Sequence, residues 1–247
     1  MERLLVIPAA GRGSRLGAAK PKPLVEVNGK PMLEHLAQLY RGFVDHFVVI
    51  AHPSFAADIA AWGKPFGNVS VVEQPSPTGM LDAILIASPI VAERRPDSVW
   101  ITWSDQVAVL PATLERLAEA ERATPPPALA LPTVACAAPY THFTRDANGR
   151  IAGFLQSREG DPMPSEGESD MGLFAMTRLT FEVDLVAYAD EVSIGSATGE
   201  RNFVPFVPWL AQRKPVVTVP CTHPSEAIGV NTPDDLREVE AWLRNRR

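Results

Sequence analysis

Residues 3–24 read "RLLVIPAAGRGSRLGAAKPKPL", an almost continuously apolar run that passes into a loop rich in glycine and basic residues. The apolar part, residues 3–8, predicts a buried strand. The amphipathic pattern of residues 31–43 predicts a helix, residues 46–51 predict a second strand and residues 53–62 a second helix. Strands that alternate with helices in this way are typical of a parallel sheet.

The alternation continues along the rest of the chain. Further strands are expected at 69–73, 98–104, 128–138, 150–157, 171–177 and 215–220, and further helices at 80–87, 111–123, 202–213 and from Pro233. The pattern predicts an α/β fold with one doubly wound, Rossmann-like, mostly parallel sheet and helices on both faces. We expect residues 1–247 to form a single domain, with a less regular insertion at about 139–200.

Composition narrows the class of protein. The chain has 247 residues, 46% hydrophobic and 21% charged, with a formal net charge of −6, which suits one soluble globular domain. This balance argues against disorder and against nucleic-acid binding driven by bulk charge. Cys136 and Cys221 form no CxxC motif, so neither a zinc site nor a disulfide framework is indicated, and a cytoplasmic setting is favoured. No apolar run is long enough to cross a membrane, so no membrane partner is expected.

The loop after the first strand is unusually basic for an acidic chain. From Arg12 to Lys22 it carries four cations and no acid. Gly11, Gly13 and Gly17 let the backbone approach a ligand closely and present N–H groups to an anion. Their spacing fits neither the P-loop nor the dinucleotide fingerprint. The loop predicts a polyphosphate site of another kind; the alternative is a solvated turn whose charges only keep the chain soluble.

Two motifs in this loop resemble the signature of a known enzyme family. Residues 10–15 follow the alanine-glycine-x-glycine-x-arginine turn of the sugar-1-phosphate nucleotidyltransferases, and residues 21–24 follow their proline-lysine-proline-leucine motif. This family is part of the superfamily of MobA-like NTP transferases and NDP-sugar pyrophosphorylases. The resemblance implies the nucleotide-diphospho-sugar transferase fold, a nucleoside triphosphate (NTP) as substrate and Mg²⁺ as cofactor.

The resemblance also implies roles for residues of the loop. Backbone amides at Ala10, Gly11 and Gly13 would bind the β- and γ-phosphates of the triphosphate together with Arg15. Lys22 would neutralise charge around the α-phosphate. Arg15 and Lys22 are therefore candidate catalytic residues.

A second stretch, "VVEQPSPTGMLDAIL" (71–85), resembles the family segment that reads the edge of the nucleobase. Gln74 and Gly79 take the positions of the glutamine and glycine that contact the base. Met80 stands where the family more often has threonine, so the base cannot be named. The alternative is that this segment only shapes a turn before a helix.

The candidate metal ligands come from two distant parts of the chain. Asp105 ends the apolar stretch "VWITWSD" (99–105), which would place a carboxylate in the crevice where Mg²⁺ binds with phosphate oxygens. The resemblance implies that Asn231 shares the metal. Thr232 and Pro233 can in addition cap and begin a helix immediately after it. The alternative for Asp105 is a helix cap or turn residue.

The acceptor side departs from the family pattern. Gln156 stands where the family commonly has glutamate, and Asp170 replaces an asparagine; both can still hydrogen-bond sugar hydroxyls. Glu200 matches a family glutamate near the sugar. The acidic stretch 157–170 is expected to be a mobile surface loop, with a lid over the acceptor as the alternative.

Together these residues predict a Mg²⁺-dependent nucleotidyltransferase that transfers the NMP group of an NTP to a sugar 1-phosphate, giving NDP-sugar and pyrophosphate. The acceptor phosphate is already ionised at neutral pH, so neither a covalent intermediate nor a general base is assigned. Two alternatives stay open: a cytidylyltransferase for a non-sugar phosphate or phosphonate, and a nucleotide-binding regulatory module without turnover. The sequence leaves the base, the sugar and the oligomeric state open.

Overall fold

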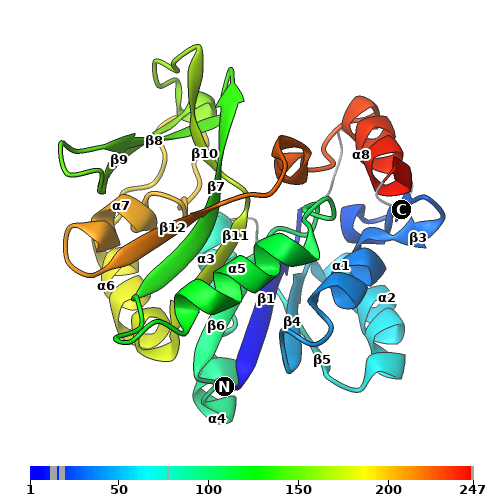
Figure 1. Ribbon diagram of the computed structural model, residues 1–247. Helices are drawn as coiled ribbons and strands as arrows, with labels where there is room; N and C mark the ends of the chain where they lie inside the picture. Colours follow the sequence, from blue (N-terminus) through cyan, green and yellow to red (C-terminus); the bar gives the residue numbers. More distant parts are fainter. Residues whose placement is uncertain (12–15, 17–19, 77, 246–247) are drawn as a thin grey trace.

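A mixed sheet runs through the middle of the protein, with helices on both sides of it (Figure 1). The computed structural model describes residues 1–11, 16, 20–76 and 78–245. Within these residues the strand order is β10 (Glu166–Asp170), β7 (Leu129–Ala137), β11 (Leu173–Thr177), β6 (Ser98–Thr102), β1 (Arg3–Ala9), β4 (His46–Ala51) and β5 (Val69–Glu73), with β12 (Val216–Pro220) paired to β7.

Strands β6, β1, β4 and β5 form the parallel half of the sheet. Every residue of β1 and β4 is buried, which explains why their sequences are apolar after the first residue of each strand. Because the strands are parallel, their carboxyl ends meet at one edge, where open α/β sheets bind ligands. The α/β fold predicted from the alternation of strands and helices is confirmed.

The segment 139–200 is more regular than the sequence predicts. Its strand β11 lies in the middle of the sheet, antiparallel to both β6 and β7. The segment also contains the hairpin of β8 (Thr141–Arg145) and β9 (Ile151–Gln156), strand β10 and helix α6 (Leu185–Glu191). Four of the five residues of β11 are buried, so this strand is part of the core and not of an accessory insertion.

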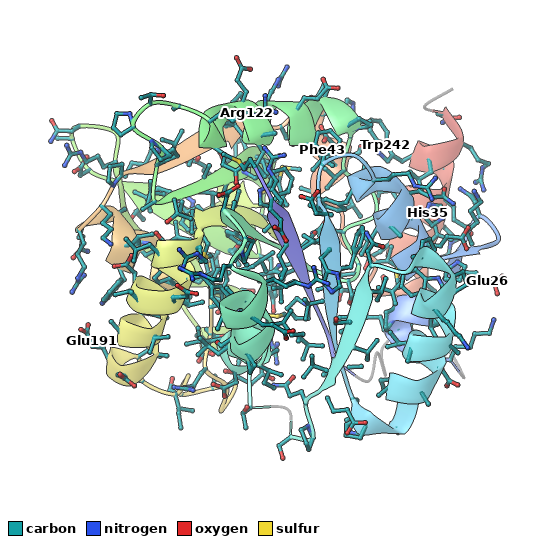
Figure 2. The ribbon with its side chains drawn as sticks, turned by 90° about the horizontal axis from the view of Figure 1, so that it is seen from below. Glu26, His35, Phe43, Arg122, Glu191 and Trp242 are labelled. Carbon is teal, nitrogen blue, oxygen red and sulfur yellow. The ribbon has the colours of Figure 1, made fainter. Side chains whose placement is uncertain are left out.

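Helices cover both faces of the sheet. One face packs against α1 (Met32–Tyr40), α2 (Pro53–Gly63), α5 (Pro111–Glu121) and α8 (Pro233–Asn245), and the other against α3 (Met80–Leu85), α4 (Ser88–Arg94), α6 and α7 (Phe206–Ala211). Alternate residues of β1 serve the two cores: Leu5 and Ile7 face the first, and Leu4 and Val6 the second. Figure 2 shows Arg122, just after α5, on one side of the sheet and Glu191, at the end of α6, on the other.

The remaining elements are short. They are β2 (Glu26–Val27), β3 (Lys30–Pro31), the 3₁₀ helices η2 (Lys22–Leu24), η3 (Lys64–Phe66), η4 (Ser157–Glu159) and η6 (Pro224–Ala227), and the π-helical turn η5 (Thr180–Asp184). The predicted helix at 80–87 is followed by a separate helix, α4, which begins with a proline in its first turn. Among the described residues, no helix is both long and apolar enough to cross a membrane.

Candidate functional site

The predicted nucleotide-binding residues lie where the parallel strands end. Residues 10–11 follow β1, Gln74 follows β5 and Asp105 comes shortly after β6. The backbone N–H of Gln74 donates to the carbonyl of Ala51, the last residue of β4, at 2.8 Å. These segments therefore share the carboxyl edge of the sheet, as the sequence predicts.

The basic loop lies only partly within the described residues. Gly13 and Arg15, both predicted to bind phosphate, lie outside them. Lys20 is described, and its Nζ lies 2.8 Å from Glu26 Oε1 in an ion pair whose two side chains are 63% and 49% exposed. This cation of the loop is thus paired with an acid that follows the loop.

Lys22, Asp105 and Asn231 meet in one cluster. The ammonium nitrogen of Lys22 donates to Asp105 Oδ2 at 2.5 Å and to Asn231 Oδ1 at 2.9 Å. The side chains of Lys22 and Asp105 are only 15% and 11% exposed. Three residues that the sequence places far apart are therefore brought together around one positive charge.

Local hydrogen bonds fix the backbone that carries Asn231. Asp235 Oδ2 accepts from the backbone N–H groups of Asn231 (2.9 Å) and Thr232 (2.8 Å), and Thr232 Oγ1 accepts from the N–H of Asp235 at 3.2 Å. This is the reciprocal cap expected at the start of α8. The N–H of Val230 also donates to the carbonyl of Asp105 at 3.2 Å, so the loop before α8 is joined directly to the loop after β6.

The oxygens of Asp105 and Asn231 fit a hard divalent cation. Both already converge on one positive charge, the Lys22 ammonium, and carboxylate and amide oxygens are ligands that Mg²⁺ accepts. Within the part of the chain that the structure describes, no group of three or more histidine, cysteine, aspartate or glutamate side chains is placed to hold a metal. With Asp105 and Asn231 as two ligands, the other positions around Mg²⁺ would go to phosphate oxygens and water.

A small cavity lies beside the residues predicted to contact the base. Its volume is about 130 Å³, and it is lined by Pro8, Ala10, Gly11, Gln74, Gly79, Met80, Ala83 and Glu200. Gln74 is only 5% exposed, and its Nε2 lies 3.4 Å from the carbonyl oxygen of Gly79. The cavity therefore joins the loop after β1 to the predicted base segment, and Glu200, predicted for the acceptor, also lines it.

Gln156 and Asp170 belong to a second group, built around the β8–β9 hairpin. Gln156 faces Thr141 across the hairpin, and Thr141 Oγ1 donates to Asp170 Oδ2 at 2.9 Å. The N–H of Gly172 donates to Asp170 Oδ1 at 2.8 Å, and the carbonyl of Gly172 accepts from the N–H of Trp103 at 3.0 Å. Asp170 is thereby tied to the loop after β6, while Glu200 lies in the cavity of the first group.

Burial sets the acid strength of Asp170. Desolvation raises the pKa of its carboxyl above the ordinary value, and hydrogen bonds from the Gly172 N–H and the Thr141 hydroxyl oppose this rise. A hydroxyl of a bound ligand would meet an acceptor when this carboxyl is ionised and a donor when it is protonated.

Comparison with known proteins agrees with this geometry. Residues 5–165 match the family model of the MobA-like NTP transferase domain, which covers the strands of the parallel half and the loops that carry Lys22, Gln74 and Asp105. The chain belongs to the MobA-like NTP transferase family. The family predicted from the glycine-rich loop is thereby confirmed.

Relatives of this NTP transferase domain include several proteins named "Bifunctional protein GlmU". The protein from Sorangium cellulosum is 33% identical over 163 residues, which are 62% of this chain and 34% of the relative. The protein from Halorhodospira halophila is 27% identical over 248 residues, 98% of this chain and 49% of the relative. The protein from Heliobacterium modesticaldum is 26% identical over 255 residues, 99% of this chain and 53% of the relative. The chain thus spans between a third and about half the length of these relatives.

One part of the transferase domain differs from the prediction of a mobile acidic loop at 157–170. Glu159 accepts hydrogen bonds from the N–H of Ala197 (3.0 Å), from Thr198 Oγ1 (2.5 Å) and from Asn202 Nδ2 (3.0 Å). The bond from Thr198, and then that from the Ala197 N–H, lower the pKa of Glu159. Residues 166–170 form strand β10, so both ends of this segment are held by the rest of the domain.

Sequence reasoning also missed Arg201, which follows the candidate Glu200. Its guanidinium binds Asp82 in the first turn of α3, and its backbone contacts the predicted base segment. A single arginine in a loop carries no spacing pattern. Only the fold brings residues 82 and 201 together.

Proposed function

We propose that this domain transfers the nucleotidyl group of a nucleoside triphosphate to the phosphate of a sugar 1-phosphate, with release of pyrophosphate. The observation that carries the proposal is the cluster in which Lys22 donates to both Asp105 and Asn231 at the ligand-binding edge of the sheet. A lysine, a carboxylate and an amide at this edge suit the charge of a triphosphate and its metal. A binding module without turnover would need only the phosphate loop.

In this proposal the nucleotide lies across the ends of β1, β5 and β6. The loop that begins at residues 10–11 binds the leaving β- and γ-phosphates, with Arg15 and Gly13 contributing as the family resemblance implies. The cavity between Gln74 and Gly79 receives the nucleobase, which fits the buried amide of Gln74. Lys22, which follows the phosphate loop in the sequence, neutralises the charge of the α-phosphate.

Asp105 and Asn231 would hold Mg²⁺ through the two oxygens that now face Lys22. When bound, a divalent cation neutralises phosphate charge and aligns the attacking and leaving oxygens. The chain's own contribution is positional. The cap at Thr232 fixes the backbone of Asn231, and the bond from the Val230 N–H fixes that of Asp105.

The reaction is a substitution at the α-phosphorus. An ionised oxygen of the acceptor phosphate attacks in line, the bond from the α-phosphorus to the bridging oxygen breaks, and pyrophosphate leaves with the electron pair. No proton has to be removed from the nucleophile, so no general base is assigned. The domain lowers the barrier by holding the reactants in line and by matching the negative charge with Lys22 and the basic loop.

The acceptor would lie between the two groups of candidate residues. Glu200 lies on the cavity wall, and Asp170 with Gln156 lies beside the loop after β6. Carboxylate and amide oxygens at these positions suit the hydroxyl groups of a sugar.

A pyrophosphate-release screen tests the proposal. The common nucleoside triphosphates are combined with a panel of sugar 1-phosphates and, for comparison, with non-sugar phosphates and phosphonates, in the presence of Mg²⁺. We expect release of one pyrophosphate per NDP-sugar formed, and none in excess chelator. Release of orthophosphate, undiminished turnover in chelator, or turnover only with non-sugar acceptors would contradict it.

A further inference from the structure

The backbone of Arg201 runs alongside the predicted base segment. Its N–H donates to the carbonyl of Thr78 at 2.9 Å, and its carbonyl accepts from the N–H of Leu81 at 3.1 Å. Residue 201 therefore closes a short ladder with residues 78–81, at the point where α3 begins.

Gly79 makes this close approach possible. Its φ of +128° lies in a region that side chains rarely adopt, and a Cβ on it would lie 2.5 Å from both the N and the O of Arg201. Any other residue at position 79 would push the two segments apart. The glycine that the sequence assigns to the base edge therefore also sets the distance between the base segment and residue 201.

The side chain of Arg201 extends the same connection to two helices. Its Nε donates to Asp82 Oδ1 at 2.7 Å, its Nη2 donates to the same oxygen, and its Nη1 donates to the carbonyl of Ala189 in α6 at 2.7 Å. Asp82 is 17% exposed and Arg201 33% exposed. A lysine would keep the charge but could not make this forked set of bonds.

The neighbours of Arg201 in sequence belong to the site. Glu200 lines the cavity that contains Gln74 and Gly79. On the other side, Asn202 donates to Glu159, which also holds Ala197. Arg201 thus lies between Glu200 and Asn202 and fixes this stretch of chain to the base segment 78–81.

We propose that Arg201 is a positioning residue that fixes the position of Glu200 relative to the base cavity. Base preference and acceptor binding then depend on the same contacts of Arg201. The inference rests on the proposed function, since Glu200 acts on the acceptor only there. Loss of the guanidinium leaves the chemistry and the backbone ladder in place, but it removes the bonds to Asp82 and Ala189 that hold this ladder against α3 and α6. The segment 78–81 and residue 200 are then held less firmly in the site. Base selection then weakens and the acceptor binds less well, while the charge around the α-phosphorus is unchanged.

The test compares Arg201→Gln with Arg213→Gln. Arg213 is a matched control because its guanidinium lies over the Trp209 ring at 3.9 Å, its side chain is 45% exposed, and it lines a different cavity. For Arg201→Gln we expect the ratio of kcat/KM between the preferred and the next triphosphate to fall on the order of tenfold, with a rise in acceptor KM. The control variant should keep both values.

The partner and a conservative variant separate positioning from simple stability. Asp82→Asn should reproduce the loss of base preference, and the double variant with Arg201→Gln should add little, because both changes remove one contact. Arg201→Lys should recover part of the preference. If Arg201→Gln lowers the melting temperature and slows all triphosphates equally, with base preference and acceptor KM unchanged, Arg201 only stabilises the fold and the inference is wrong.

Hydrogen exchange on the free protein keeps this inference separate from the proposed function. The amides of residues 78–84 should exchange faster in Arg201→Gln than in wild type or Arg213→Gln, whether or not turnover is found. If wild type turns over no combination of triphosphate and acceptor, the proposed function is wrong. If hydrogen exchange at residues 78–84 is unchanged in Arg201→Gln, the positioning role is wrong, whatever the turnover.

Discussion

Replacing Lys22 by methionine would show how the cluster of Lys22, Asp105 and Asn231 works. The ammonium donates to two oxygens, from Asp105 and Asn231, that we propose as ligands of the metal. Methionine matches the apolar stem of lysine as far as Cε but lacks the charged ammonium group. We expect the free protein to lose stability and to become more responsive to Mg²⁺, because the two oxygens then face each other without a cation.

The size of the loss follows from the geometry. At 2.5 Å and an effective dielectric constant of about 20, Coulomb's law gives roughly 7 kcal/mol of gross attraction between Lys22 and Asp105. Desolvation of two side chains that are only 15% and 11% exposed cancels most of this attraction. Removal of one partner from such a partly buried pair should cost about 2 kcal/mol, between the values of exposed and fully buried pairs. For a chain of this length that lowers the melting temperature by about 4–8 °C.

Thermal unfolding with and without Mg²⁺, and without nucleotide, measures both effects. At a concentration ten times its Kd, a metal that binds only the folded state adds about 1.4 kcal/mol. Lys22→Met should gain this stabilisation to a greater extent than wild type, in which the ammonium competes for the oxygens. Lys20→Met is the matched control, since the pair of Lys20 with Glu26 is exposed and should contribute less than about 1 kcal/mol. An Mg²⁺ response in Lys22→Met no larger than in wild type would refute the assignment of these oxygens to a metal.

Three further sets of changes test the site and the core. Asp105→Asn should lower kcat on the order of a hundredfold or more, with little change in triphosphate affinity. Asn231→Ala should lower kcat by a smaller factor. If the losses in the double variant are strictly additive at every metal concentration, the metal binds elsewhere. Gln74→Ala should reduce discrimination among bases more than it reduces the rate with the preferred triphosphate. If the kcat/KM ratios between triphosphates are unchanged, Gln74 only shapes the turn and does not contact the base. Burial, together with Arg94, lowers the pKa of His46 from 6.5 to about 4, so stability should fall by about 3 kcal/mol as the pH drops from 7 to 4, because the unfolded chain binds the proton first. His46→Asn should show a correspondingly smaller fall in urea unfolding at the two pH values, and an equal fall would assign the acid sensitivity to other groups.

The parallel half of the fold could be predicted because its signals are local. The strands β1 and β4 are apolar at every position after their first residues, Arg3 and His46, and helix α1 has a clear amphipathic pattern. Once the strands are parallel, the positions of Gln74 and Asp105 follow, since residues just after such strands share one edge of the sheet. Lys22 and Asn231 are added to this place by the family resemblance of their motifs, and not by the strand pattern.

The other half depends on pairing that no local pattern encodes. Strand β11 has the composition of a strand, yet its position between β6 and β7 is set by non-local partners. Glu159 lies in an acidic run of the kind that is usually solvated, and only the contact with residues 197–202 changes that. The same holds for Arg201, whose partner Asp82 is more than a hundred residues away in the chain.

The two parts of the site are held by different kinds of contact, and the difference matches what each part has to do. The ammonium of Lys22 is held by an ion pair with Asp105 and a hydrogen bond to Asn231, and such contacts can be exchanged when a triphosphate with its own charge enters. The cavity that we propose for the base is held by the backbone bonds between Arg201 and residues 78–81, by the close approach at Gly79 and by the guanidinium bonds to Asp82 and Ala189, which a ligand cannot replace. Discrimination between similar bases requires walls that keep their shape, because a wall that yields loses the energy difference between the right and the wrong base. The charge that develops on a leaving pyrophosphate is stabilised by cations already placed around it, whatever the base. A change at Lys22 should therefore appear in the rate for every base, and a change at Arg201 in the choice between bases.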